Sequence, residues 1–294
     1  MIARDERLKD ALEELVRRTD VPSRIDQDPI AFPRRFKDSV DIEIAGWLAS
    51  GLAYGRVPLF QAALEKILAA MGGQPARFVA RFDPVKDVEA FLPLYYRMNE
   101  GRDIAAFLYM MGRIVDRHGS VGALFESLYR ESDDDIGPTL ERFVRRAQSI
   151  DTSAVYGRDV HPPGLARFFA LPSKGSSCKR QNLFLRWMIR PNDGLDFGLW
   201  KKIPPSKLIV PLDTHVLRIS RYLGLTRRKS AGWAAAKEIT DRLKRIDPAD
   251  PLRFDFPLCH HGISGACPAA RAPEKCRACA LLVECAKGRM LARV

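Results

Sequence analysis

The sequence has no long apolar segment. Its longest uncharged apolar run, around residues 44–54, is too short to cross a bilayer, which takes roughly 20 apolar residues. The N-terminal residues MIARDERLKDALEELVRR are charged from the start and lack the apolar stretch of a signal peptide. We therefore expect an intracellular, cytoplasmic protein without a membrane partner.

Acidic residues are in deficit. The chain has 36 Asp and Glu against 48 Lys and Arg, which gives a formal net charge of +12. An excess of this size favours a polyanionic partner, with nucleic acid ahead of a membrane surface. Charge alone does not decide the matter, because many basic proteins bind nothing anionic.

The sequence also lacks a convincing alternating strand pattern and an internal repeat. Apolar residues instead recur at helical spacing, and Gly- and Pro-containing breakers separate the stripes. Examples are the stripes Leu8-Leu12-Leu15, Ile44-Leu48-Leu52 and Leu140-Phe143-Val144-Ala147. The pattern predicts an all-α protein of many short helices, and 294 residues are enough for one large domain or two lobes.

Cysteines are few, and four of the six lie in one short segment. Cys267, Cys276, Cys279 and Cys285 have the spacing C-x8-C-x2-C-x5-C, which suits a [4Fe–4S] cluster whose irons each take one thiolate. A structural zinc more often uses two C-x2-C pairs, so zinc is the alternative, and a reducing compartment argues against disulfides. The x8 spacing leaves the first ligand open, with Cys259 as the substitute candidate.

One junction resembles a phosphate-binding turn. Residues 164–170 read as a short helix, residues 171–176 as a tight turn with Gly175, and residues 177–190 as a second helix that begins Ser-Cys-Lys-Arg. Backbone N–H groups, a positive helix terminus and cations would converge there and hold a phosphate without reading sequence. An ordinary connector between helices is the competing interpretation.

A second segment, Pro211 to Gly224, opens a helix with Asp213 at or next to its N-cap. With it, the chain resembles the helix-hairpin-helix DNA glycosylases, the superfamily of endonuclease III and the adenine glycosylase, and most closely an uncharacterised bacterial branch of it. The resembling motifs are Leu-Pro-x-x-Gly at 171–175, Leu-Asp-Thr-His-Val-x-Arg at 212–218, the cysteine loop at 267–285, His261-Gly262, and, more loosely, 53–57 and 179–187.

The resemblance implies two helical lobes with a helix-hairpin-helix and a C-terminal cluster loop. One lobe would span residues 39–204 and carry the hairpin at about 164–190. The other would combine residues 1–38 with 205–294 and hold the cluster loop at 267–285.

The resemblance also implies a function, the cleavage of the N-glycosidic bond of a damaged or mispaired base that is flipped out of the duplex. Asp213 would match the catalytic aspartate, whose charge opposes the cationic sugar or orients water; a plain N-cap is its alternative role. Bifunctional members carry a nucleophilic lysine where this chain has Ser177, so we expect a monofunctional hydrolase, with Lys179 as the substitute nucleophile. A catalytically silent iron–sulfur protein that binds nucleic acid is the alternative function.

The resemblance implies that the partner is double-stranded DNA. We expect the protein to be a monomer and to associate with the nucleoid. Basic residues gather between residues 174 and 229, Arg186 among them, and Tyr95, Tyr96 and Arg97 are candidates for stacking on a base. The predicted DNA-binding residues are Lys174, Gly175, Ser176, Ser177, Arg180, Tyr54, Arg56, Arg271 and Lys275.

Overall fold

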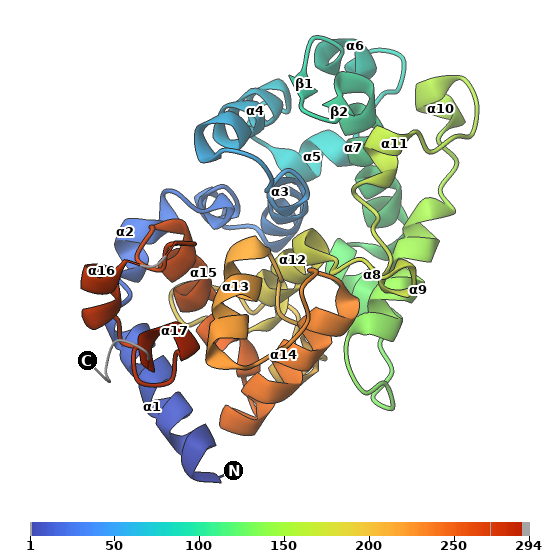
Figure 1. Cartoon of the computed structure of the whole chain (residues 1–294). Coiled ribbons are helices and arrows are strands. Elements are labelled where there is room, and N and C mark those ends of the chain that lie inside the picture. Colours follow the sequence, from blue (N-terminus) through green and yellow to red (C-terminus); the bar gives the residue numbers. More distant parts are fainter. Residues whose placement is uncertain (1, 271, 290–294) are drawn as a thin grey trace. The chain divides into compact units, whose positions relative to one another are not determined.

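The computed structural model describes residues 2–270 and 272–289. Helices make up most of the regular structure (Figure 1), which confirms the predicted predominance of helix. In these residues the one sheet is a two-stranded antiparallel hairpin of β1 (Tyr95–Tyr96) and β2 (Asn99–Glu100), too short to show an alternating pattern in the sequence. None of the helices in the described ranges has the length and apolar character needed to span a membrane.

The chain divides into two compact units. Unit 1 consists of Met1–Arg24, Gly175–Arg186 and Pro204–Val294, and unit 2 consists of Ile25–Lys174 and Trp187–Ile203. The lobe limits expected from the sequence, 39–204 against 1–38 with 205–294, stay a prediction.

Unit 2 is built around the amphipathic helix α7 (Gly101–His118), which packs on α5, α6, α8 and α10. A capping box closes its first turn, because Glu100 and Asp103 each accept a hydrogen bond from the backbone N–H of the other. The other helices of this unit are α3 (Ser39–Gly51), α4 (Val57–Ala70), α5 (Pro75–Ala80), α6 (Asp87–Phe91), α8 (Val121–Ser127), α9 (Gly137–Gln148), α10 (Ser153–Tyr156), α11 (Pro163–Ala166), and the 3₁₀ turns Pro29–Ala31, Pro33–Arg35 and Pro172–Lys174.

Unit 1 is organised by the packing of α13 (Thr214–Leu223) on α15 (Asp255–Ile263). The N-terminal helix α1 (Ile2–Arg18) packs on α14 (Trp233–Ile246) and α15, so the first helix lies beside the C-terminal segments (Figure 1). The remaining elements are α16 (Pro273–Arg277), α17 (Ala286–Arg289), the 3₁₀ turns Pro205–Lys207 and Pro251–Phe254, and two helices that cross the unit boundaries, α2 (Val21–Ile25) and α12 (Lys179–Ile189).

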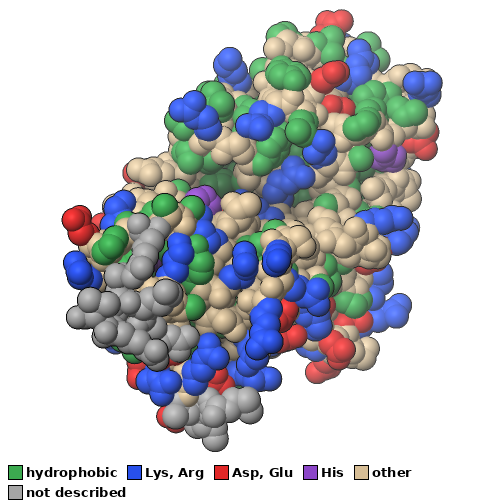
Figure 2. Space-filling model, viewed as in Figure 1, with side chains coloured by type: hydrophobic (Ala, Val, Ile, Leu, Met, Phe, Trp, Pro, Cys, Tyr) green, Lys and Arg blue, Asp and Glu red, His purple; other side chains and the backbone are tan. Residues whose placement is uncertain are grey.

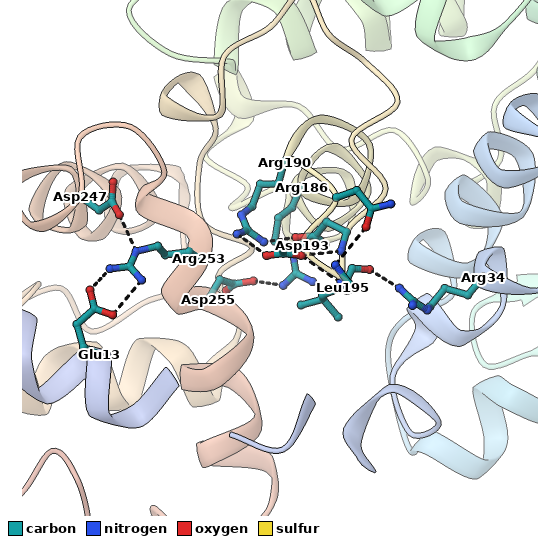
Figure 3. A network of polar contacts seen from close by, with 12 residues as sticks. Glu13, Arg34, Arg186, Arg190, Asp193, Leu195, Asp247, Arg253 and Asp255 are labelled. Carbon is teal, nitrogen blue, oxygen red and sulfur yellow. Dashed lines mark hydrogen bonds and ion pairs between the residues drawn. The ribbon is translucent and has the colours of Figure 1, made fainter. Parts of the chain in front are cut away.

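One buried ion pair and a set of partly buried ones tie the helices of unit 1 together (Figure 3). Arg186 Nη1 of α12 lies 2.6 Å from Asp255 Oδ2 of α15, and their side chains are only 2% and 3% exposed. Arg253 contacts both Glu13 of α1 and Asp247, the latter at 2.6 Å. The structure therefore corrects one expectation: Arg186 is an internal residue and not part of a surface that faces DNA.

In unit 2, Figure 3 shows a second network around Arg190. Its guanidinium pairs with the buried Asp196 and, at 2.9 Å, with Asp193. In the same unit, Arg34 donates a hydrogen bond to the Leu195 carbonyl oxygen at 2.8 Å. These contacts fix the loop that follows α12.

Candidate functional site

The turn that joins α11 to α12, here called the Gly175 turn (residues 171–178), has two backbone positions with positive φ. Gly175 has φ of +77° and Cys178 has φ of +48°. A residue in this left-handed region cannot continue an α-helix, so α12 begins at Lys179 and not at the predicted Ser177. The predicted helix over 164–170 is likewise shorter and is the four-residue α11, followed by a 3₁₀ turn.

The Gly175 turn is anchored on the start of α14 and on the segment before α13. The Gly175 carbonyl oxygen accepts a hydrogen bond from the Trp233 backbone N–H at 3.1 Å, and Ser176 forms an isolated antiparallel bridge with Gly232. Ser177 Oγ donates to the Leu212 carbonyl oxygen at 3.3 Å. Since Leu212 directly precedes Asp213, the structure brings the predicted turn and the predicted carboxylate together.

Asp213 is the N-cap of α13. Its Oδ1 accepts hydrogen bonds from the backbone N–H groups of His215 and Val216, both at 2.8 Å. Its Oδ2 lies 3.7 Å from Sγ of Cys259, and a thiol is a weak donor. The Asp213 side chain is half-buried. One of its carboxylate oxygens caps the helix, and the other has only the weakly bonding Cys259 thiol as a neighbour.

Cys267, Cys276, Cys279 and Cys285 line one pocket of unit 1. Its walls also include Tyr222 and Leu282, and its cavity volume is about 30 Å³. Burial is the main cause that raises the pKa of the Cys267 and Cys279 thiols. Among residues 2–270 and 272–289, no three His, Cys, Asp or Glu side chains form the close-set ligand group of a single metal ion.

Several hydrogen bonds surround the cysteine pocket. The Leu281 backbone N–H donates to Cys279 Sγ at 3.4 Å, and His261 Nε2 lies 3.3 Å from the same sulfur. Arg218 of α13 donates to the Cys267 carbonyl oxygen at 2.7 Å. The helix that carries Asp213 therefore also holds the cysteine loop.

The predicted basic residues differ in their surroundings. Lys174 is exposed, whereas Lys179 and Arg180, on the first turn of α12, are half-buried. Lys275 is exposed and donates to the Gly265 carbonyl oxygen at 3.0 Å, while Arg271 lies outside the described residues. Figure 2 shows further Lys and Arg side chains over α13 and α14. Unit 1 thus presents cations on the helices that support the Gly175 turn.

Tyr54 and Arg56 belong to unit 2. The Tyr54 hydroxyl donates to the Tyr96 carbonyl oxygen at 3.2 Å and also contacts Asn99. Its ring lies 5.0 Å from the ring of Tyr96, whereas Arg56 is exposed at the N-cap of α4. Tyr54 is therefore part of a packed tyrosine pair.

Comparison with known proteins identifies the family. The model of the family described as "Protein of unknown function (DUF2400)" matches residues 28–264. The chain belongs to the DUF2400 family. The match includes the Gly175 turn, Asp213 and Cys259 and ends three residues before Cys267. No curated protein and no solved structure matches the chain.

The family match corrects the expected membership of the helix-hairpin-helix DNA glycosylase superfamily. The DUF2400 model covers most of the chain, and no glycosylase family matches. The resemblance rested on short motifs, namely a capped helix start, a glycine turn and a cysteine spacing. Each of these meets a local physical need that unrelated helical proteins share.

Two residues of the site were missed or misjudged from the sequence. The sequence assigns no role to His261, which lies beside Cys279, and it predicts Cys259 as a buried helix residue, with a substitute metal ligand as the alternative. Both lie on α15, and their neighbours are set by the packing of α15 on α13 and on the cysteine loop. Spacing along the chain carries no signal for such contacts.

Proposed function

We propose that this DUF2400 protein is a DNA-binding iron–sulfur protein that cleaves the N-glycosidic bond of a damaged or mispaired base, acting in the cytoplasm at the nucleoid. One observation carries the proposal. Around α13, unit 1 combines a glycine turn with flanking cations, a half-buried carboxylate and a pocket lined by four thiols. The proposed phosphate-binding turn, the proposed catalytic carboxylate and the proposed cluster ligands thus all lie around α13 of unit 1.

The DNA contact is proposed at the unit 1 part of the Gly175 turn, residues 175–178, and at the first turn of α12. The conformation of the Gly175 turn is held by the bonds to Trp233 and Leu212, and Lys179 and Arg180 follow at the start of α12. A rigid turn of this kind contacts phosphates and leaves base edges unread. Binding to duplex DNA should therefore depend on salt and show little sequence preference.

Replacing Lys179 and Arg180 together by Ala tests this contact. We expect weaker binding to duplex DNA and a shallower salt dependence, because two cations near phosphate are lost. The matched control replaces Lys86 and Arg117, two exposed cations of unit 2, and removes the same charge. Equal losses in both variants would mean that net charge, and not the Gly175 turn, governs affinity.

The cysteine pocket fits a [4Fe–4S] cluster by its donor set. Four thiols line it, and the Leu281 N–H already points to Cys279 Sγ, as expected for a sulfur that becomes a charged ligand. When bound, the cluster would link the four cysteines and so cross-link the loop of residues 267–285. Arg218 would then hold the loop to α13 through the Cys267 carbonyl oxygen.

For the chemistry, we propose that Asp213 acts on a base flipped out of the duplex. Water forms a bond to the sugar carbon, the carbon–nitrogen bond breaks, and the base leaves with the bonding electrons and a proton. Positive charge develops on the sugar, and the Asp213 carboxylate opposes it or orients the water. Oδ2 is the oxygen suited to this task, because Oδ1 accepts both capping hydrogen bonds.

The test is a panel of duplexes that each carry one lesion or mismatch. Strand breaks after alkali report base release, and breaks without alkali report a lyase. A lysine nucleophile would be trapped by borohydride as a Schiff base adduct, so we expect no adduct, or one that is lost in Lys179→Ala. An adduct that persists in Lys179→Ala would contradict both roles.

A second function, silent binding of DNA by an iron–sulfur protein, has its own support. Both carboxylate oxygens of Asp213 have partners inside unit 1, which is what a plain N-cap requires. Retained duplex binding with no base release from any member of the panel would favour this alternative.

A further inference from the structure

Unit 2 has a pocket that the function proposed for unit 1 does not use. It lies between α4 and the β1–β2 hairpin and has a cavity volume of about 330 Å³. Ile67 and Ile104 are buried in its floor, each 1% exposed. At its rim Tyr95 is 70% exposed and Leu59 is 51% exposed.

The charges at this pocket have one sign. Lys66 of α4 and Arg97 of the hairpin line it, and none of the lining residues is acidic. Figure 2 shows hydrophobic and basic side chains mixed over the region of α4 and the hairpin. An exposed aromatic ring in a pocket that two cations line suits a ligand that is planar and anionic, and it suits the apolar face of a protein helix less well.

The hairpin that presents Tyr95 is held rigidly. The Tyr96 hydroxyl donates to the Tyr54 carbonyl oxygen, and the Tyr54 hydroxyl donates back to the Tyr96 carbonyl oxygen at 3.2 Å. Asn99 is buried and donates to the Gly164 carbonyl oxygen at 2.8 Å. These bonds hold the backbone that carries Tyr95, so less backbone freedom is lost when a base stacks on its ring, which favours binding.

Arg97 occupies a strained position. Its φ is +56°, a conformation that costs little only for glycine or asparagine at such a turn. A Cβ added to Gly55 would lie 2.9 Å from Arg97 Nη1, so the missing side chain of Gly55 leaves room for the guanidinium. A strained arginine beside an aromatic pocket indicates that the guanidinium has a task there.

We propose that this pocket binds an unpaired nucleotide of single-stranded nucleic acid, with the base stacked on Tyr95 and the flanking phosphates held by Lys66 and Arg97. The nucleotide chemistry is shared with free mononucleotides, so the assay includes both sources. The assignment does not depend on any chemistry at Asp213.

The experiment measures the affinity of the full chain for a fluorescent oligothymidylate, for the same sequence as a duplex, and for thymidine monophosphate. Tyr95→Ala should weaken binding of the single strand about 5- to 150-fold, the range for losing one stacked base, while Tyr95→Phe keeps the ring and the affinity. Arg97→Gly should also weaken binding, yet raise the urea midpoint because the strain is relieved.

The outcomes separate the alternatives. Duplex affinity that falls in the Lys179→Ala/Arg180→Ala variant but not in Tyr95→Ala supports two distinct surfaces. Competition by thymidine monophosphate at low concentration would assign the pocket to a free nucleotide and overturn the strand as its ligand. Unchanged single-strand affinity in Tyr95→Ala, or a dimer that Tyr95→Ala dissociates in sedimentation, would overturn the proposal.

Discussion

The buried pair of Arg186 and Asp255 makes a quantitative prediction about unit 1. Arg186→Met keeps most of the side-chain volume but leaves the Asp255 carboxylate, 3% exposed, without its guanidinium at 2.6 Å. Removing one partner of a buried pair costs about 3–5 kcal/mol of unfolding free energy. The double variant Arg186→Met/Asp255→Leu should recover most of this loss, because no charge is left buried.

Urea unfolding followed by circular dichroism measures this prediction. The slope of free energy against urea should stay constant while the midpoint falls in Arg186→Met. Arg117→Met on α7 is the control, since an exposed arginine changes stability by no more than about 0.5 kcal/mol. A wild-type midpoint combined with a loss of duplex affinity in Arg186→Met would refute the reasoning and return Arg186 to the DNA surface.

Three further predictions concern packing, pH and metal. Gly122→Ala should destabilise unit 2 by about 2–4 kcal/mol in urea, because the new Cβ would lie 2.2 Å from Trp200 Nε1, which donates to Glu43. Burial raises the pKa of the Glu43 carboxyl in the folded protein above its value in the unfolded chain. The protonated carboxyl therefore stabilises the fold at acidic pH, and this stabilisation is lost as the pH rises through the raised pKa. Over that pH range the urea midpoint of the wild type should fall relative to that of Glu43→Gln. Anaerobically purified protein should contain roughly four iron and four sulfide per chain, and Cys276→Ala should lose them; stoichiometric zinc without sulfide would reject the cluster.

Local features of this protein could be predicted from the sequence. The apolar stripe of Leu8, Leu12 and Leu15 lies on the helix α1, and the cap at Asp213 lies where the sequence indicates it. Both depend on interactions within one or two helical turns, which a sequence pattern records directly.

Features that depend on packing could not be predicted. Helix α12 starts late because Cys178 takes a left-handed conformation beside the bridge of Ser176 to Gly232, a contact across more than 50 residues. The burial of Arg186 depends on Asp255 of another helix, and so a cation that the sequence counts as basic surface is internal. The family assignment failed for a related reason, because short local motifs do not identify a fold.

Base release by Asp213→Asn, measured under single turnover on the duplex that wild-type protein cleaves, tests the central claim most directly. Asn keeps the acceptor for the N–H groups of His215 and Val216 but removes the charge, so the fold and DNA binding should persist while base release falls at least about a hundredfold. Asp38→Asn is the matched control, because Asp38 caps α3 with the same geometry, accepting from the Val40 and Asp41 N–H groups. Equal base release by wild type, Asp38→Asn and Asp213→Asn would contradict the account and leave Asp213 as an N-cap alone.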